Sequence, residues 1–473
     1  MTNRWLIALA GTVEMACLGT VYSWSLFTQP LRAAFGWSST ATTWAFALCI
    51  FALGVGAVVG GRWQDRVGPR PVAITGVLLW AVGNVLAGLG TARFGAPWLY
   101  ATYGLIGGFG CGLGYVTPVT AVTKWFPDRR GLGSGMVVMG FGLGAFFYSQ
   151  ILKAVPSFSA ATKESARALA ANAALSPDGT HAVLSTFTTS GIVFAILGGL
   201  CAAMVRNPPV ASLAPAPATS PGAVSPERRA GTAGPETREA PETRGGPETR
   251  GGPETRGALA DMPPSQALRT PQFWALWAML FLNVTAGILF VSNAVPILVE
   301  LTGMAAASAL ALYGFLALFN GLGRFFWGAV SDRLGRNLAY LLIYGSQAII
   351  FFLVGGLHAV WLVGALFAIV LLDYGGGFGT MPSFTADYFG TRYMGVNYGW
   401  ILLAWGVGGI VGPIFVAAVK DATGSFAGAL PVIGFIMLGA SVLPLVTRRP
   451  GTAAREPADR WSHLRPPQRA GAH

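Results

Sequence analysis

Long apolar stretches alternate with short polar segments along nearly the whole chain. Each stretch is close to the roughly 20 residues that a helix needs to cross a hydrocarbon core about 30 Å thick. A transmembrane β-barrel would instead show segments of about ten residues in which polar and apolar side chains alternate, and the sequence does not have that pattern. We therefore predict an all-α membrane protein with twelve transmembrane helices. The predicted spans are 5–27, 42–60, 71–92, 97–121, 131–153, 184–205, 271–298, 304–328, 337–357, 360–386, 394–418 and 427–446.

The charged residues indicate how such a chain lies in a membrane. Of the 473 residues 53% are hydrophobic and only 11% are charged, with a net charge of +12. If the N-terminus is cytoplasmic, the short inner loops carry nine Lys and Arg residues and the outer loops carry six, as the positive-inside rule expects. The basic residues thus indicate topology rather than a nucleic-acid partner. We expect a multi-pass protein of the cell (inner) membrane with both termini in the cytoplasm, and a first apolar stretch that is retained as a helix.

A polar segment divides the apolar stretches into two sets of six. It is rich in Pro, Gly, Ala, Ser and Thr, and the tetrad Pro-Glu-Thr-Arg recurs four times in it. Such a composition cannot build a core, so it favours a disordered cytoplasmic linker, with docking of a partner as the alternative. The predicted domains are an N-terminal six-helix bundle over 1–205, this linker over 206–268, a C-terminal six-helix bundle over 269–447 and a disordered cytoplasmic tail over 448–473.

Two pairs of loops match at a nearly constant offset. GRWQDRVGPR begins at Gly61, and GAVSDRLGRN begins at Gly328, 267 positions later. TPVTAVTKWFPDRRG ends at Gly131, and the looser match MPSFTADYFGTRYMG ends at Gly395, 264 positions later. Two correspondences at one offset indicate a duplicated six-helix unit, and hence two bundles related by a pseudo-two-fold axis.

The repeated G-x-x-x-D-R-x-G pattern resembles the signature of the major facilitator superfamily. The resemblance implies two bundles that rock around a central site, with this loop as a gate. The glycines let neighbouring helices approach, while Asp65 and Asp332 can cap a helix start or pair with Arg66 and Arg333; an ordinary charged turn is the alternative. The predicted gating residues are Gly61, Asp65, Arg66, Gly68, Gly328, Asp332, Arg333 and Gly335.

Further stretches resemble the oxalate/formate antiporter family, which includes bacterial monocarboxylate transporters. They are VYSWSLFTQPL, GLGYVTPV, KWFPDRRGLGSG, NGLGR and YGGGFGTMPSFTADYFG, in this order on the chain. The resemblance implies that Tyr115 and Tyr374 project into the cavity; packing between helices is the alternative. The pattern of the oxalate-exchanging members of this family also includes a lysine in helix eleven. The stretch NYGWILLAWGVGGIVGP here has no Lys or Arg, and its neutral candidates are Ala404 and Trp405.

Three ionisable side chains besides His, Tyr and Cys lie well inside predicted spans, namely Glu14, Arg324 and Asp373. Buried charges are costly in a bilayer, so each is a functional candidate. Arg324 lies eight residues before Asp332, about 12 Å along a helix, which places it near the middle of the membrane. Its planar donor fork suits a carboxylate, and Asn320 lies four residues earlier on the same helix face. The alternative is a structural arginine paired with Glu14 or Asp373.

One fixed cation matches one carboxylate, whereas oxalate would leave a negative charge poorly compensated. The sequence therefore predicts a secondary transporter of a small monocarboxylate anion such as lactate, pyruvate or formate, working by alternating access as a monomer in the lipid bilayer. Glu14 and Asp373 are candidates for coupling a proton to transport. An oxalate/formate-type exchanger, driven by a counter-anion, and a transporter-derived membrane sensor remain alternatives. We expect no enzyme activity, cofactor or metal, because the spans offer no nucleophile with its base, metal cluster or cofactor loop.

Overall fold

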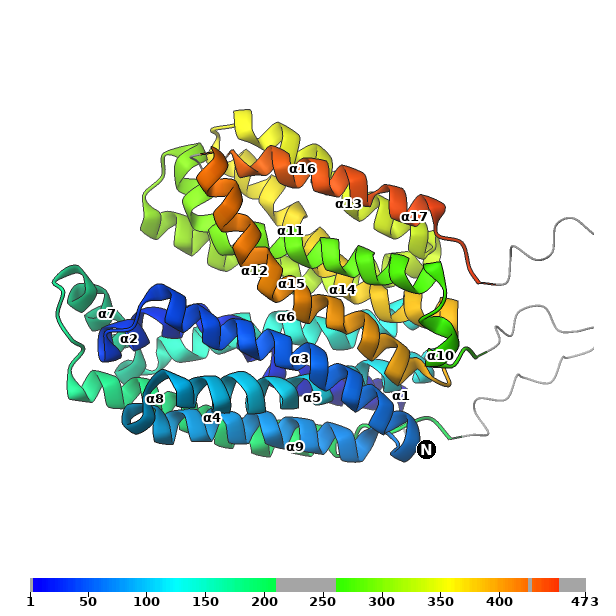
Figure 1. Cartoon of the computed structure of the whole chain (residues 1–473), viewed down its shortest axis with the longest axis horizontal. Helices are drawn as coiled ribbons and strands as arrows, with labels where there is room; N and C mark the ends of the chain where they lie inside the picture. Colours follow the sequence, from blue (N-terminus) through cyan, green and yellow to red (C-terminus); the bar gives the residue numbers. More distant parts are fainter. Residues whose placement is uncertain (1–2, 210–260, 424–427, 451–473) are drawn as a thin grey trace, which may run out of the picture. The chain divides into compact units, whose positions relative to one another are not determined.

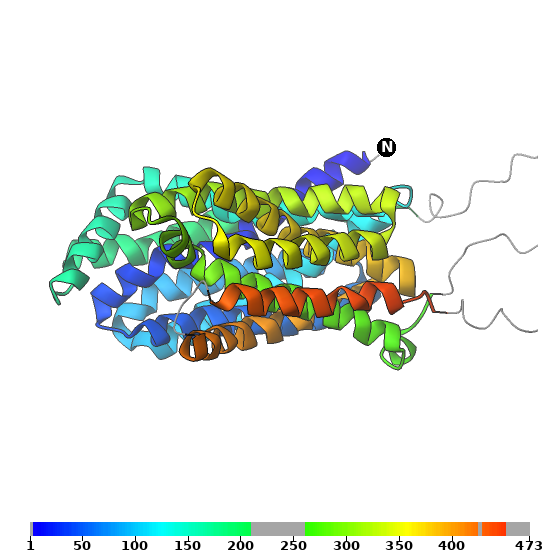
Figure 2. The ribbon, with the colours of Figure 1, turned by 90° about the horizontal axis from the view of Figure 1, so that it is seen from above.

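The computed structural model describes residues 3–209, 261–423 and 428–450, and it is helical throughout these ranges apart from turns and short connections. The Pro-Glu-Thr-Arg repeats and nearly all of the predicted tail lie outside the described residues, so the predicted domain boundaries stay predictions. In two perpendicular views the helices run side by side along one direction (Figures 1 and 2).

The first six predicted spans correspond to helices of the first half. Polar caps fix the starts of α1 and α3, where Asn3 and Ser38 each accept a hydrogen bond from a backbone N–H of the first turn. The elements are α1 (Arg4–Gly19), η1 (Thr20–Trp24), α2 (Ser25–Phe35), α3 (Ser39–Val67), α4 (Pro69–Leu99), η2 (Tyr100–Gly107), α5 (Gly108–Trp125), α6 (Arg130–Ala154), α7 (Pro156–Ala170), α8 (Pro177–Val193), η3 (Phe194–Gly198) and α9 (Gly199–Ala202).

The second half repeats the arrangement after the linker. Thr270 caps its first long helix by accepting from the backbone N–H of Phe273 at 3.2 Å. The elements are α10 (Pro264–Ala267), α11 (Pro271–Thr302), α12 (Ala306–Leu334), α13 (Arg336–Leu353), η5 (Val354–Gly356), α14 (Val360–Phe389), α15 (Met394–Thr423), α16 (Ala429–Ala440) and α17 (Val442–Val446).

The described helices correspond to the twelve predicted spans, so the predicted all-α membrane fold is confirmed. Within the described residues, nine helical stretches are long and apolar enough to span a membrane, and one of these, Pro69–Trp125, is 57 residues long. This stretch holds both the third and the fourth predicted span. The two spans are separated at Gly95, where the chain reverses direction and where a φ of 71° favours glycine. Helix α7 was not among the predicted elements; it fills the connection before the sixth span.

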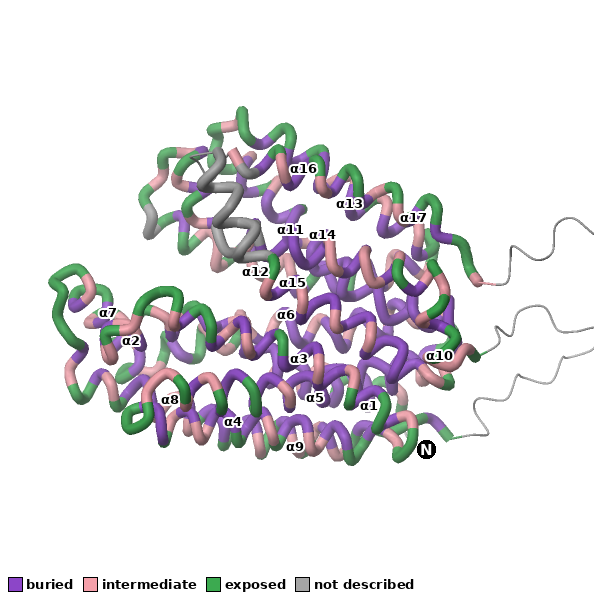
Figure 3. Tube along the Cα trace, viewed as in Figure 1, coloured by how far each residue is buried: buried purple, intermediate pink, exposed green. Residues whose placement is uncertain are grey.

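The two halves meet along two helix pairs, α3 with α15 and α6 with α12. A Cβ atom built on Gly61 would lie 2.0 Å from the carbonyl oxygen of Gly395, and one on Gly131 would lie 2.0 Å from that of Gly328. Backbone therefore touches backbone, which only glycine allows. Buried residues concentrate on α5, α14 and the part of α15 up to Val411, and exposed residues on the outer faces of helices such as α4 and α16 (Figure 3).

Candidate functional site

Arg324 lies in α12 and has an exposed fraction of 0%. Its Nε donates a hydrogen bond to Oδ1 of Asn320 at 3.4 Å, as their shared helix face predicts. Its two terminal nitrogens, Nη1 and Nη2, are buried and have no hydrogen-bond partner. A guanidinium cannot lose its proton in a protein, so this site contains a fixed, uncompensated positive charge.

Two phenylalanine rings hold the guanidinium, one from each half. The Cζ atom of Arg324 lies 4.8 Å from the ring centre of Phe378 on α14 and 5.6 Å from that of Phe141 on α6. Both separations are within the range of cation–π attraction. The arginine is thus positioned between the halves, in contact with an aromatic side chain of each.

Several polar side chains converge on this arginine without finding partners. The hydroxyls of Tyr22, Tyr115 and Tyr398 and the indole N–H of Trp405 are buried and unpaired. The ring centres of Tyr22 and Tyr115 lie 5.5 and 5.0 Å from that of Phe141, and the ring centre of Tyr374 lies 5.6 Å from that of Phe378. Buried polar groups are nearly always paired in folded proteins, so a group of unpaired donors around a cation is suited to an anion that presents several acceptor oxygens.

Trp405 joins the aromatic rings of both halves. Its ring centre lies 5.3 Å from Tyr115 and 6.0 Å from Tyr22, and also 5.4 Å from Phe141 and 4.9 Å from Phe378. We call Tyr22, Tyr115, Phe141, Phe378 and Trp405 the aromatic cage.

The structure leaves both buried acids away from Arg324. Oδ1 of Asp373 accepts a hydrogen bond from Trp327 at 2.8 Å, and its Oδ2 accepts one from Ser346 at 2.6 Å. Glu14 is buried between α1 and α5, and neither of its oxygens has a hydrogen-bond partner. No ion pair of the described residues includes Arg324. The alternative of an arginine paired with either acid is therefore not what the structure shows.

Of the predicted binding residues, the structure brings Arg324, Asn320, Tyr115 and Tyr374 together. The ring of Tyr374 also packs on Gly287 of α11, so that a Cβ on this glycine would lie 2.1 Å from it. Sequence reasoning missed Tyr22, Phe141, Phe378 and Tyr398 as members of the site. Tyr22 and Phe378 lie in stretches that carry the family resemblance, and Phe141 and Tyr398 lie in predicted spans, but neither signal shows which aromatic side chains face inward.

The predicted gate acids cap helices of the opposite half. Both carboxylate oxygens of Asp65 accept hydrogen bonds at the start of α15, from the backbone N–H groups of Gly395 at 3.2 Å and Val396 at 2.9 Å. Asp332 does the same at the start of α6, where Gly131 and Leu132 each donate at 2.8 Å. The positive end of each helix dipole thus faces an acid of the other half.

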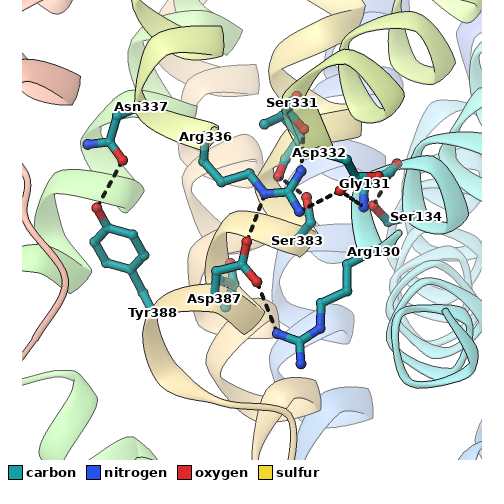
Figure 4. A network of polar contacts seen from close by, with 12 residues as sticks. Arg130, Gly131, Ser134, Ser331, Asp332, Arg336, Asn337, Ser383, Asp387 and Tyr388 are labelled. Carbon is teal, nitrogen blue, oxygen red and sulfur yellow. Dashed lines mark hydrogen bonds and ion pairs between the residues drawn. The ribbon is translucent and has the colours of Figure 1, made fainter. Parts of the chain in front are cut away.

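The second gate acid belongs to a larger network of charges (Figure 4). Arg336 pairs with Asp332 at 2.7 Å and with Asp387 at 2.8 Å, and it also donates to Ser331. Asp387 in turn pairs at 3.0 Å with Arg130, the first residue of α6. The network therefore joins the halves by an ion pair as well as by a helix cap.

The first gate acid differs from the second. Over the described ranges Asp65 makes no ion pair, and Lys124 acts on it only at longer range. Arg66 and Arg333, which were predicted as possible partners of the gate acids, are exposed and form no ion pair in the part of the chain that the structure describes.

Comparisons with known proteins bear on the family and the fold of the chain. A family model described as Major Facilitator Superfamily matches residues 9–413. An oxalate:formate antiporter of Oxalobacter formigenes is 29% identical over 420 residues, covering 88% of this chain and 85% of that protein. Apicoplast pyruvate carrier 1 of Toxoplasma gondii is 27% identical, covering 84% and 81%. The crystal structure of FucP in the outward conformation has a TM-score of 0.65 at 15% identity, covering 94% of this chain and 98% of that one, and supports the fold.

Proposed function

Because the chain belongs to the major facilitator superfamily, we propose that it is a secondary active transporter that moves small monocarboxylates across the membrane by alternating access. The single observation that carries this proposal is the buried, unpaired guanidinium of Arg324 between the two halves. A carboxylate binds such a planar fork through two parallel hydrogen bonds. A monoanion would neutralise the site, whereas a dianion would bring a second negative charge without a cation to meet it.

The relatives support a small carboxylate as the substrate. One is named for the exchange of oxalate and formate and another for carrying pyruvate. Exchange of one anion for another is therefore a second candidate function, and a sensor derived from a transporter is a more distant one. Two carboxylates are candidates for coupling a proton to uptake, Glu14 and Asp373. Glu14 is the better suited, because Asp373 already accepts two hydrogen bonds and Glu14 accepts none.

The accessibility of the site indicates the route of the substrate. Asn320 and Tyr313, which lie farther along α12 from the gate than Arg324, are partly exposed, while Arg324 itself is buried. On the other side, the caps of Asp65 and Asp332 hold the gate shut. Substrate would enter from the end opposite the gate, and release at the gate would require both caps to break. Since we place the termini and the gate in the cytoplasm, the site in this conformation is open toward the outer side of the membrane.

Uptake into proteoliposomes tests the proposal. The purified chain is reconstituted and given an imposed proton gradient, and uptake of labelled lactate, pyruvate, formate, acetate and oxalate is compared. We expect uptake of monocarboxylates that the proton gradient drives, and its loss in Arg324→Lys, because an ammonium cannot reproduce the planar fork. Arg269→Lys, at an exposed arginine outside the gate loops, is the matched control. Normal uptake by Arg324→Lys would refute the site, and strong oxalate counterflow without proton dependence would favour the exchanger.

A further inference from the structure

We infer that Trp405 is a substrate-binding residue whose indole N–H donates a hydrogen bond to an oxygen on carbon 2 of the substrate. The site would then select 2-oxo and 2-hydroxy monocarboxylates over simple acids such as acetate or propionate. This inference rests on the proposed function, because it assumes that Arg324 binds the carboxylate of the same molecule.

The position of Trp405 relative to Arg324 follows from the two rings that both residues contact. The guanidinium carbon lies 4.8 Å from the ring of Phe378 and 5.6 Å from that of Phe141. The indole ring lies 4.9 Å from Phe378 and 5.4 Å from Phe141. Arginine and tryptophan thus share both ring neighbours, which places them at one small site where the two halves meet.

The chemistry of the indole N–H distinguishes it from the buried tyrosine hydroxyls around the site. A tyrosine hydroxyl can donate or accept, so Tyr22, Tyr115 and Tyr398 could satisfy one another or bind water. An indole N–H can only donate, and this one is buried without an acceptor. No tyrosine hydroxyl of the cage accepts from it, so this N–H is left without an acceptor among the described residues.

The number of acceptors decides which substrates fit. A carboxylate bound through both terminal nitrogens of Arg324 directs its two oxygens toward the arginine. Formate, acetate and propionate have no further oxygen, and would leave the N–H of Trp405 unpaired in a buried site. A 2-oxo or 2-hydroxy acid has a third oxygen on the adjacent carbon. Since tryptophan is neutral, it favours this uncharged oxygen over a second carboxylate.

Lactate and propionate test the inference, because they differ only in the hydroxyl on carbon 2. Uptake of each into proteoliposomes gives kcat/KM for the full chain. Sites that hydrogen-bond a substrate hydroxyl reject the analogue without it strongly, so we expect a preference for lactate of at least about 100-fold. Trp405→Phe keeps an aromatic ring but removes the N–H, and should lower this preference to less than about 10-fold through loss of lactate transport. The matched control is Trp400→Phe, on the same helix but partly exposed.

A second replacement separates loss of the N–H from loss of packing. Benzothienylalanine in place of Trp405 keeps the two fused rings and has sulfur where the N–H was; it should behave as Trp405→Phe does. An unchanged lactate preference in both variants, or no preference in the unmodified chain, would overturn the inference while leaving Arg324-dependent uptake intact. Absence of uptake of every acid, with no effect of Arg324→Lys, would instead refute the proposed function.

Discussion

The cap that Asp332 places on α6 should control the balance between the closed and open gate. Asp332→Asn keeps one amide oxygen that can accept from Gly131 or Leu132, but not from both. The variant loses one hydrogen bond to a charged group, worth about 1.5–3 kcal/mol. It also loses the attraction between a carboxylate and the helix dipole, worth about 0.3–1 kcal/mol. The total of about 2–4 kcal/mol would shift the equilibrium toward the open gate by roughly 30-fold to 700-fold.

Spin labels on the two gate loops can measure this shift. Cysteines in place of Arg66 and Arg333 lie on opposite halves, and both positions are exposed. Cys201, which is only partly buried, is first replaced by alanine, while the other three cysteines are buried and can stay. Double electron–electron resonance then reports the distribution of distances between the labels, and Asp332→Asn should raise the long-distance population.

Two controls decide whether the cap is the cause. Asp65→Asn removes the equivalent cap of α15 and should give a shift in the same direction, without the loss of an ion pair. Asp128→Asn changes an exposed acid whose ion-pair partner, Arg4, is in the same half, so it should give none. A distance distribution that does not change in Asp332→Asn, or that changes equally in Asp128→Asn, would refute the role of the caps.

Two further variants test the gate contact and the coupling. Gly61→Ala would place a Cβ 2.0 Å from the carbonyl oxygen of Gly395, and overpacking of about 1–3 kcal/mol should favour the open gate by roughly 5-fold to 150-fold in the same spin-label measurement. Gly345→Ala, whose Cβ would meet no atom within 4 Å, should have no effect, and an equal shift in both would contradict the contact. Glu14→Gln should abolish accumulation driven by a proton gradient but keep counterflow, whereas Asp373→Asn should keep both; accumulation by Glu14→Gln would exclude Glu14 as the proton carrier.

The sequence alone predicts the parts of the site that stand out from a hydrophobic background. A lone arginine within a span is conspicuous because burying a charge is costly, and Asn320 follows from helical spacing. The aromatic cage could not be predicted in the same way. Phe141 and Phe378 lie in spans that are apolar on every side, where periodicity does not separate a face toward lipid from a face toward the site.

The gate shows the same limit at longer range. The sequence indicates that Asp65 and Asp332 could cap a helix start, but the helices that they cap begin 329 and 202 positions away, at Met394 and Arg130. No local pattern connects an acid to a helix so distant in the chain. Only the packing of the two halves, backbone against backbone at their glycines, brings each acid to the N–H groups that it accepts from.

The two halves cap each other's helices reciprocally, as the two subunits of an isologous interface contact each other. An acid of the first half caps the fifth helix of the second, and the equivalent acid of the second caps the fifth helix of the first. In a symmetric dimer, residue i of one subunit contacts residue j of the other, and j contacts i in return. Two identical copies of an ancestral six-helix subunit could therefore have closed on each other with the same pair of contacts. Fusion into one chain then allowed the copies to diverge, and the second could acquire an arginine that the first does not have.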